Sequence, residues 1–356
     1  LRQDVLGDRH PDTLISMHTL ALAYQQVGRN EEAIALLEET LELMRVEFGE
    51  RHFDTLNTMK SLAGIYKAVG RNEEAVGLLE ETLELVRAEL GERHFGTLDT
   101  TNGFADAYVA VSRFEEAVGL LEPTLTTTRE VLGDYHPATL TCMSNLAGAY
   151  SEGGRFAEAL DLTEKTRSLM REVLGERHPR TLVSMRSLAV VYSQVGRNEE
   201  AVRLLEETFD LMRAELGERH PGTLSTMNSL ALAYGAVGRN EAIELHEKTL
   251  SLMREVLGER HPSTLISMNN RALAYRLAGR YEEAGKLYDE TIEFLQDPSA
   301  ETKKAPDTIT KEYANVLAGA AETSLQLKQP EKAESLSRES LKLRERLTPE
   351  HWSRFH

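Results

Sequence analysis

The chain has 356 residues, of which 41% are hydrophobic and 28% are charged, and its formal net charge is −17. An acidic chain without a basic stripe is a poor nucleic-acid binder, because phosphate neutralisation supplies most non-specific affinity. No apolar run approaches the roughly 18 residues of a membrane helix, and the single cysteine, Cys142, excludes an internal disulfide. We therefore expect a cytoplasmic protein that binds neither nucleic acid nor membrane.

The first residues of the chain resemble the end of a repeat that occurs later. The segment from Leu1 to Gly7 matches the segment from Leu169 to Gly175 almost residue for residue. We interpret residues 1–12 as the end of a truncated preceding repeat, and the chain as a piece of a longer protein. An open N-terminal end of this kind would expose apolar surface, through which we expect self-association to be possible.

A unit of 42 residues then recurs along the chain. It is marked by the glycines Gly7, Gly49, Gly91, Gly133, Gly175, Gly217 and Gly258. Self-similarity at a fixed period of this length predicts a solenoid. We divide residues 13–296 into seven repeats, with the bounds 13–54, 55–96, 97–138, 139–180, 181–222, 223–263 and 264–296. The sixth repeat is one residue shorter, at the start of its second helix.

Each repeat contains two stretches with helical spacing of apolar residues. The first stretch of repeat 1 carries Leu14, Met17, Leu20, Ala21, Tyr24 and Val27. The second stretch carries Ala33, Leu37, Leu41, Met44 and Phe48. Two helices with one apolar face each bury those faces only by stacking on their neighbours, so the sequence predicts an all-α superhelix.

Small residues and tyrosines mark where the paired helices approach each other. Ala21 and Tyr24 recur in every repeat on the first helix, and Ala33 recurs on the second. This pattern resembles the tetratricopeptide repeat, in the 42-residue variant of kinesin light chains and of sensor regions in fungal and bacterial NTPase switch proteins. The resemblance implies a right-handed α-solenoid of about seven helix-turn-helix units plus a divergent C-terminal unit. It also implies that the first helix of each repeat lines a concave groove.

The positions beside this framework vary from repeat to repeat. Variation within a copied unit predicts a surface that recognises a partner, and drift on a solvated face is the alternative. The predicted partner-binding residues are His18, Gln25, Asn57, Lys60, Lys67, Asp99, Asn102, Asp106, Asn145, Arg186, Asn228, Asn269, Asn270 and Arg276. We expect the asparagines to bind backbone amides and the basic side chains to bind acidic groups.

Two repeats depart from the pattern. In repeat 3, Phe95 replaces proline, Ser112 replaces the turn glycine and Pro123 falls inside the second helix, which predicts a bend or local opening near 112–128. This irregularity is either a hinge or decay of the repeat. In repeat 7, Arg271 stands where other repeats have leucine, and we expect it to pair with a carboxylate or to extend toward solvent, with direct contact to a ligand as the alternative.

The pattern lapses after the seventh repeat. Residues 297–307 are polar and are predicted to be a linker. Helical spacing returns over 308–327 and 331–347, which predicts a divergent eighth repeat with a polar outer face that closes the stack. Residues 348–356 form a tail.

Nothing in the sequence predicts catalysis, a cofactor or a metal site. The repeated histidines, His10 and its copies, are a whole repeat apart, so they cannot share an ion, and we interpret them as caps or packing residues of the links. Phosphate-loop, zinc-protease and nucleophile-elbow motifs are missing. Acidic pairs such as Glu38-Glu39 are interpreted as solvated charges.

Two classes of function remain. The first is a non-enzymatic module that binds a peptide or a partner segment in the groove. The second is the ligand-sensing arm of a multidomain NTPase switch protein, which the resemblance also allows.

Overall fold

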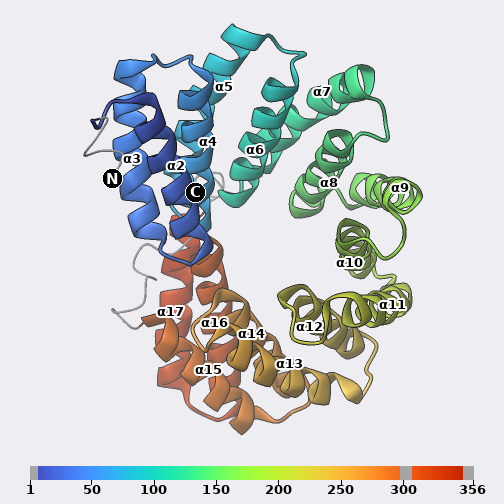
Figure 1. The fold of residues 1–356 in the computed structure, drawn as a ribbon. Helices are drawn as coiled ribbons and strands as arrows, with labels where there is room; N and C mark the ends of the chain where they lie inside the picture. The colour runs from blue at the N-terminus through green and yellow to red at the C-terminus, as the bar shows by residue number, and fades with distance from the viewer. Residues whose placement is uncertain (1–6, 297–306, 348–356) are drawn as a thin grey trace, which may run out of the picture. The chain divides into compact units, whose positions relative to one another are not determined.

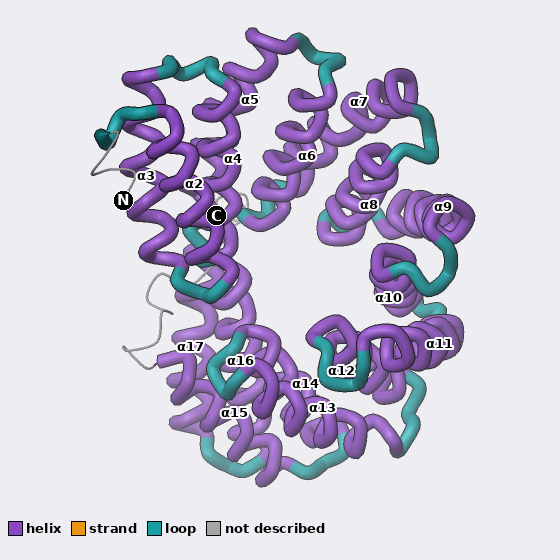
Figure 2. Tube along the Cα trace, viewed as in Figure 1, coloured by secondary structure: helices purple, strands orange, loops and turns teal. Residues whose placement is uncertain are grey.

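The computed structural model describes residues 7–296 and 307–347, and these residues form sixteen helices and no strand (Figures 1 and 2). The all-α prediction is confirmed. The helices divide into two compact bodies, residues 1–154 and 155–356, which we call the N-terminal body and the C-terminal body. The division falls in the turn between the two helices of repeat 4.

The helices follow the predicted pairs. The N-terminal body contains α2 (Pro11–Gln26), α3 (Asn30–Glu47), α4 (Phe53–Ala68), α5 (Asn72–Leu90), α6 (Phe95–Ala110), α7 (Phe114–Leu132) and α8 (Pro137–Glu152). The C-terminal body contains α9 (Phe156–Leu174), α10 (Pro179–Gln194), α11 (Asn198–Leu216), α12 (Pro221–Ala236), α13 (Glu241–Leu257), α14 (Pro262–Leu277), α15 (Tyr281–Gln296), α16 (Asp307–Gln326) and α17 (Pro330–Leu347). Each first helix begins two residues before the repeat boundary that we chose.

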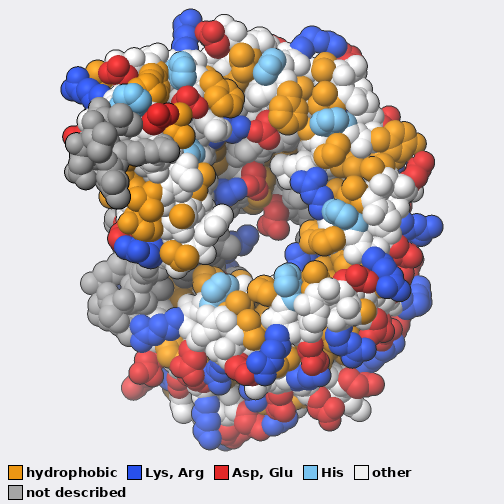
Figure 3. Space-filling view, viewed as in Figure 1, with side chains coloured by type: hydrophobic (Ala, Val, Ile, Leu, Met, Phe, Trp, Pro, Cys, Tyr) orange, Lys and Arg blue, Asp and Glu red, His pale blue; other side chains and the backbone are white. Residues whose placement is uncertain are grey.

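The predicted eighth repeat is the pair α16 and α17, which pack against each other. Its helices begin and end within one residue of the predicted spans. Residues 1–6, 297–306 and 348–356 lie outside the described part of the chain, so the linker, the tail and most of the first segment stay predictions. In the C-terminal body, acidic and basic side chains intermix over α13 and α15 (Figure 3).

A recurring link joins each repeat to the next. Its glycine has a positive φ of 81–91°, a conformation that strains any residue with a Cβ. Three residues later a histidine caps the next first helix, because its Nδ1 accepts the N–H two residues ahead at 3.0–3.3 Å. In four links a threonine hydroxyl also donates to the glycine carbonyl. The interpretation of the histidines as caps is confirmed.

The core of each hairpin is built on the small residues that mark close approach of the helices. Ala33 and its copies Ala75, Ala117, Ala159, Ala201 and Ala284 are completely buried. Ala21, on the first helix, is also completely buried. A larger side chain at these positions would push the paired helices apart.

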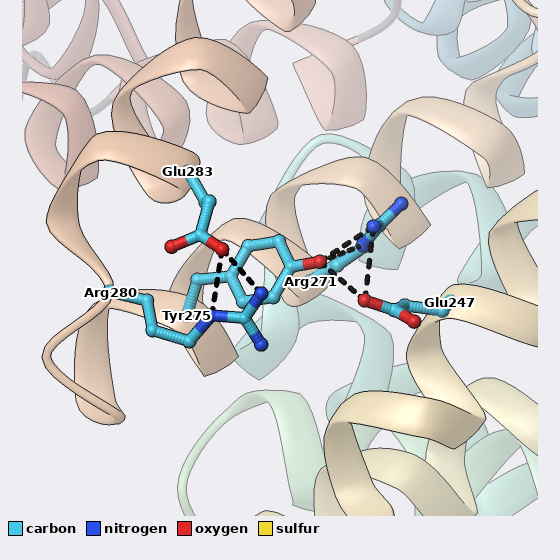
Figure 4. A network of polar contacts seen from close by, with 5 residues as sticks. All are labelled: Glu247, Arg271, Tyr275, Arg280 and Glu283. Atoms are coloured by element: carbon cyan, nitrogen blue, oxygen red, sulfur yellow. Dashed lines mark hydrogen bonds and ion pairs between the residues drawn. The ribbon is translucent and has the colours of Figure 1, made fainter.

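A polar network joins successive repeats (Figure 4). The Tyr275 hydroxyl on α14 donates to Glu247 on α13 at 2.6 Å, and the Arg280 guanidinium lies 4.3 Å from the Tyr275 ring centre. Arg280 also pairs with Glu283, three residues ahead on α15. Arg271 joins this network, since it donates to the Tyr275 hydroxyl and pairs with Glu247 at 3.3 Å. The predicted carboxylate partner of Arg271 is thereby found.

The same network occurs in other repeats. Tyrosine hydroxyls donate to a glutamate 28 residues earlier in the pairs Tyr66–Glu38, Tyr150–Glu122, Tyr192–Glu164 and Tyr234–Glu206. Burial and the neighbouring carboxylate raise the pKa of Tyr66 to about 12. Glu38 is exposed, as interpreted, and it also accepts a hydrogen bond from the next repeat, which the sequence did not predict.

Repeat 3 stays helical where an opening was predicted. Helix α7 runs without interruption through Pro123. Pro123 and Gly119 are both exposed, so the Gly119 carbonyl, which loses its partner to the proline, faces water. The helix is therefore not broken near 112–128, and the predicted bend or opening in solution stays a prediction. Ser112 adopts the left-handed conformation of the turn glycines, with a φ of 61°.

Helix α2 exposes apolar side chains that are covered in later repeats. Leu20 is 45% exposed, whereas its copy Leu62 on α4 is 2% exposed. This agrees with the apolar surface expected there, and self-association through it stays a prediction. None of the described helices combines the length and the hydrophobicity that crossing a bilayer requires.

Candidate functional site

The predicted partner-binding residues lie on the first helices of the repeats, and these helices contact one another. In the N-terminal body α2 contacts α4, α4 contacts α6, and α6 contacts α8; in the C-terminal body the same holds for α10, α12, α14 and α16. Among the described residues these contacts are more extensive than those between successive second helices. The first helices therefore form the inner side of each body, as the resemblance implied.

A cleft of about 270 Å³ lies on the inner side of the N-terminal body. It is lined by α4, α6 and α8, with Leu79 of α5 at its base. Six of the predicted residues meet in it: Lys60, Lys67, Asp99, Asn102, Asp106 and Asn145. Gly64 on α4 and Gly103 on α6 also line the cleft, and an added Cβ at either would meet nothing within 4 Å.

The two lysines of the cleft are paired across adjacent first helices. Lys60 pairs with Asp99, and Lys67 pairs with Asp106, both on α6. Each pair joins residues 39 positions apart, the offset between stacked first helices. The lining is therefore charge-balanced, and an acidic group of a partner would have to compete with these aspartates.

Asn102 is a buried polar side chain of the cleft. It is 6% exposed, and its Oδ1 is buried without a hydrogen-bond partner. Leaving a buried acceptor unpaired costs about 1–3 kcal/mol. An N–H donor from a bound molecule would remove this cost.

The other predicted residues of the N-terminal body lie outside the cleft. His18 Nδ1 is 2.9 Å from Thr58 Oγ1 on α4, and burial lowers the pKa of this imidazole. Gln25 is half-buried and Asn57 is exposed. His18 joins two first helices, whereas the structure gives Gln25 and Asn57 no shared site.

The predicted residues of the C-terminal body are partly engaged within the protein. Asn269 Nδ2 donates to Glu312 Oε1 at 2.7 Å, and Arg276 pairs with Glu322 at 2.5 Å. Burial raises the pKa of Glu312. Asn270 is half-buried on α14. These contacts fix α14 against α16 and leave less of the predicted surface for a partner.

Sequence reasoning did not identify all residues of the cleft. Gly64 and Gly103 shape it because they lack side chains, and Thr100, Thr141 and Leu79 complete its lining. A signal was present in the repeat itself. Asp106 stands one repeat after Gly64, and Asn145 one repeat after Gly103, so the missing side chains mark an opening in the inner face.

Stacked helical hairpins whose first helices contact one another within each body define a repeat scaffold, the class of protein that presents an extended binding face. The sequence profile of the tetratricopeptide repeat matches this chain in seven overlapping stretches between residues 1 and 297. The chain belongs to the tetratricopeptide repeat family, whose arrays are in general non-catalytic interaction scaffolds. Among curated proteins, no relative matches the sequence.

Solved structures with a similar fold come from several kinds of protein. A putative kinesin light chain with nearly identical repeats from Podospora anserina is 32% identical, and the match covers 58% of this chain and 99% of that one, with a TM-score of 0.49. A Rap protein complexed with competence and sporulation factor is 12% identical over 95% of this chain and 99% of that one, with a TM-score of 0.61.

A third structure is a signal transduction ATPase with numerous domains, which carries a tetratricopeptide repeat sensor, from Pyrococcus horikoshii. It is 17% identical over 94% of this chain and 50% of that one, with a TM-score of 0.56. At this identity the likeness shows the fold alone.

Proposed function

We propose that this chain is a non-enzymatic module that binds an extended peptide, or a segment of a partner protein, on the surface formed by its first helices. The observation that carries the proposal is the cleft between α4, α6 and α8. Six of the predicted residues line it, and one of them, Asn102, carries a buried amide oxygen that has no hydrogen-bond partner among the described residues.

The chemistry of the cleft suits a peptide backbone. The Asn102 carbonyl accepts a backbone N–H, and the half-buried Asn145 amide on α8 offers both a donor and an acceptor. The lysine–aspartate pairs on either side keep the lining polar without net charge. Backbone contacts then supply affinity, and neighbouring side-chain pockets supply selectivity, as in other modes of peptide recognition.

Filling the cleft tests the proposal without removing any polar group. Gly64→Met places a side chain into the cleft from α4, where the backbone is helical and open space surrounds the position. Gly77→Met on α5 is the matched control, because Gly77 is also helical, exposed and free of close neighbours but lies outside the cleft. Both changes replace a helical glycine, so neither should lower the stability of its helix.

The measurement is selection from a displayed library of random dodecapeptides on the full chain. We expect the unchanged protein and Gly77→Met to enrich the same peptides, and Gly64→Met to lose at least about tenfold in affinity for them, which corresponds to 1.4 kcal/mol. Equal binding by Gly64→Met, or failure of the unchanged protein to enrich any peptide, would contradict the proposal.

The role of ligand-sensing arm in an NTPase switch protein stays a prediction. The similar ATPase from Pyrococcus horikoshii contains such a sensor, and this chain matches half of it. Peptide binding on the first helices is compatible with that role, but no feature of the described residues favours it over a free-standing module.

A further inference from the structure

Two links of the N-terminal body expose an aromatic side chain where the other links carry proline. The residue after the link histidine is Phe53 at the start of α4 and Phe95 at the start of α6. In the other five links it is proline, namely Pro11, Pro137, Pro179, Pro221 and Pro262. Phe53 is 73% exposed and Phe95 is 49% exposed. Because proline suits the first position of a helix, the helix ends themselves do not require phenylalanine.

The two rings belong to a larger apolar patch. Beside Phe53, the half-buried Phe48 ring packs on His52, with 4.8 Å between the ring centres. Beside Phe95, the exposed Leu90 lies against the start of α6. Figure 3 shows hydrophobic side chains next to histidines on this face of the N-terminal body. We call Phe48, Phe53, Leu90 and Phe95 the aromatic edge, and clustered exposed apolar side chains of this kind mark an interaction surface.

The spacing of the two exposed rings suits one backbone conformation of a partner. Phe53 and Phe95 occupy the same position on α4 and α6, and these two helices contact each other. Packed helices lie about 8–10 Å apart, so the rings are separated by about that distance. In a polyproline II helix each residue advances about 3.1 Å, so prolines three positions apart are separated by about 9 Å. Each ring can therefore contact one of the two prolines.

The charge of the aromatic edge favours a basic residue beside those prolines. Residues 47–54 and 89–96, which contain the two links, carry two arginines and five acidic residues, the latter being Glu47, Glu50, Asp54, Glu89 and Glu92. The faces of exposed phenyl rings also attract cations. The surface therefore complements a segment that combines proline with lysine or arginine.

We propose that the aromatic edge is a second docking surface, which binds a proline-rich, basic segment of a partner protein in the polyproline II conformation. Phe53 and Phe95 each contact one of two prolines spaced three positions apart. A segment that already adopts this conformation loses little entropy when it binds. None of the four residues of the aromatic edge lines the cleft between α4, α6 and α8, so this inference does not rest on the proposed function.

The test replaces both rings by the residue that the chain itself uses in its other links. The double variant Phe53→Pro, Phe95→Pro keeps a residue that begins a first helix in five repeats, so we expect it to fold. Thermal unfolding followed by circular dichroism verifies this. Phe156→Asn is the matched control, because Phe156 is an exposed aromatic residue at the start of α9, where Asn30, Asn72 and Asn198 stand in other repeats.

The measurement is selection on the full chain from displayed dodecapeptides with two prolines fixed three positions apart and all other positions random. Fluorescence anisotropy then gives the affinities of labelled synthetic copies. We expect lysine or arginine to be enriched beside the prolines. The unchanged protein, Phe156→Asn and Gly64→Met should bind equally, whereas the double variant should bind at least about tenfold more weakly. A copy with the prolines four positions apart should also lose about tenfold.

Equal binding by the double variant, or failure of the library to yield any peptide, would overturn this inference and leave the proposed function standing. Loss of binding in Gly64→Met, with the double variant unaffected, would place the peptide in the cleft. That result would overturn this inference while supporting the proposed function.

Discussion

His246 places an ionisable group at a core position of α13. Leu37, Leu79, Leu121 and Leu205 occupy the same position in other repeats. The imidazole is 1% exposed, and its Nδ1 has no hydrogen-bond partner. Burial, together with the nearby charge of Arg271, lowers the pKa of His246 to about 4.

This depressed pKa makes stability depend on pH. The unfolded chain binds a proton at His246 once the pH falls below the ordinary pKa of 6.5. The folded chain binds this proton only when the pH falls to about 4. The contribution of the neutral imidazole to stability is therefore complete above pH 6.5, and it is lost as the pH falls toward 4.

His246→Leu should remove this dependence. Between about pH 7 and about pH 5, the unfolding free energy of the unchanged protein should fall by about 2 kcal/mol more than that of the variant. Urea unfolding at the two pH values measures the difference. His261, whose pKa burial also lowers, stays in both proteins and provides a common background. Parallel losses of stability in the two proteins would contradict this account.

At the scale of elements, the sequence predicted the helices well because the same two apolar stripes recur in all seven repeats. The links were predicted only in part. Their histidine caps were expected, but the threonine hydroxyl that closes the link onto its glycine was not, because its partner is a backbone carbonyl. Pro123 does not break α7, since its exposed position lets water replace the lost hydrogen bond.

The sequence predicted individual residues of the site, but it did not predict which of them form ion pairs with each other. The varying positions of the first helices identified Lys60, Asp99 and Asn102, which do meet in the cleft. Each ion pair joins residues 39 positions apart on two stacked first helices. The apolar and polar pattern within a single helix does not indicate this separation. The expected role of the lysines was therefore incomplete.

Ser112 offers a test of strain in the turn between α6 and α7. It adopts a φ of 61°, where the equivalent turns have glycine. Because a left-handed residue with a Cβ costs about 1–2 kcal/mol, Ser112→Gly should stabilise the protein by about 1 kcal/mol despite the greater freedom of glycine in the unfolded chain. Chemical denaturation measures the gain. Gly154→Ser, in the equivalent turn with a φ of 77°, should lose a similar amount. A loss of stability in Ser112→Gly, or a gain in Gly154→Ser, would refute the interpretation.

At the scale of the whole molecule, the inner helices of the two bodies carry different charge. The N-terminal body offers a balanced cleft with a buried amide, and the C-terminal body offers Arg186 and Asn228, both half-buried, on helices without acidic residues. The formal charge of the chain, −17, hides this difference.

A crystal structure of the full chain with a peptide enriched from the library would test the central claim most directly. The account predicts that the peptide contacts α4, α6 and α8 and places an N–H within hydrogen-bonding distance of Asn102 Oδ1. A peptide bound to the second helices, α5 and α7, with the cleft left free, would contradict it.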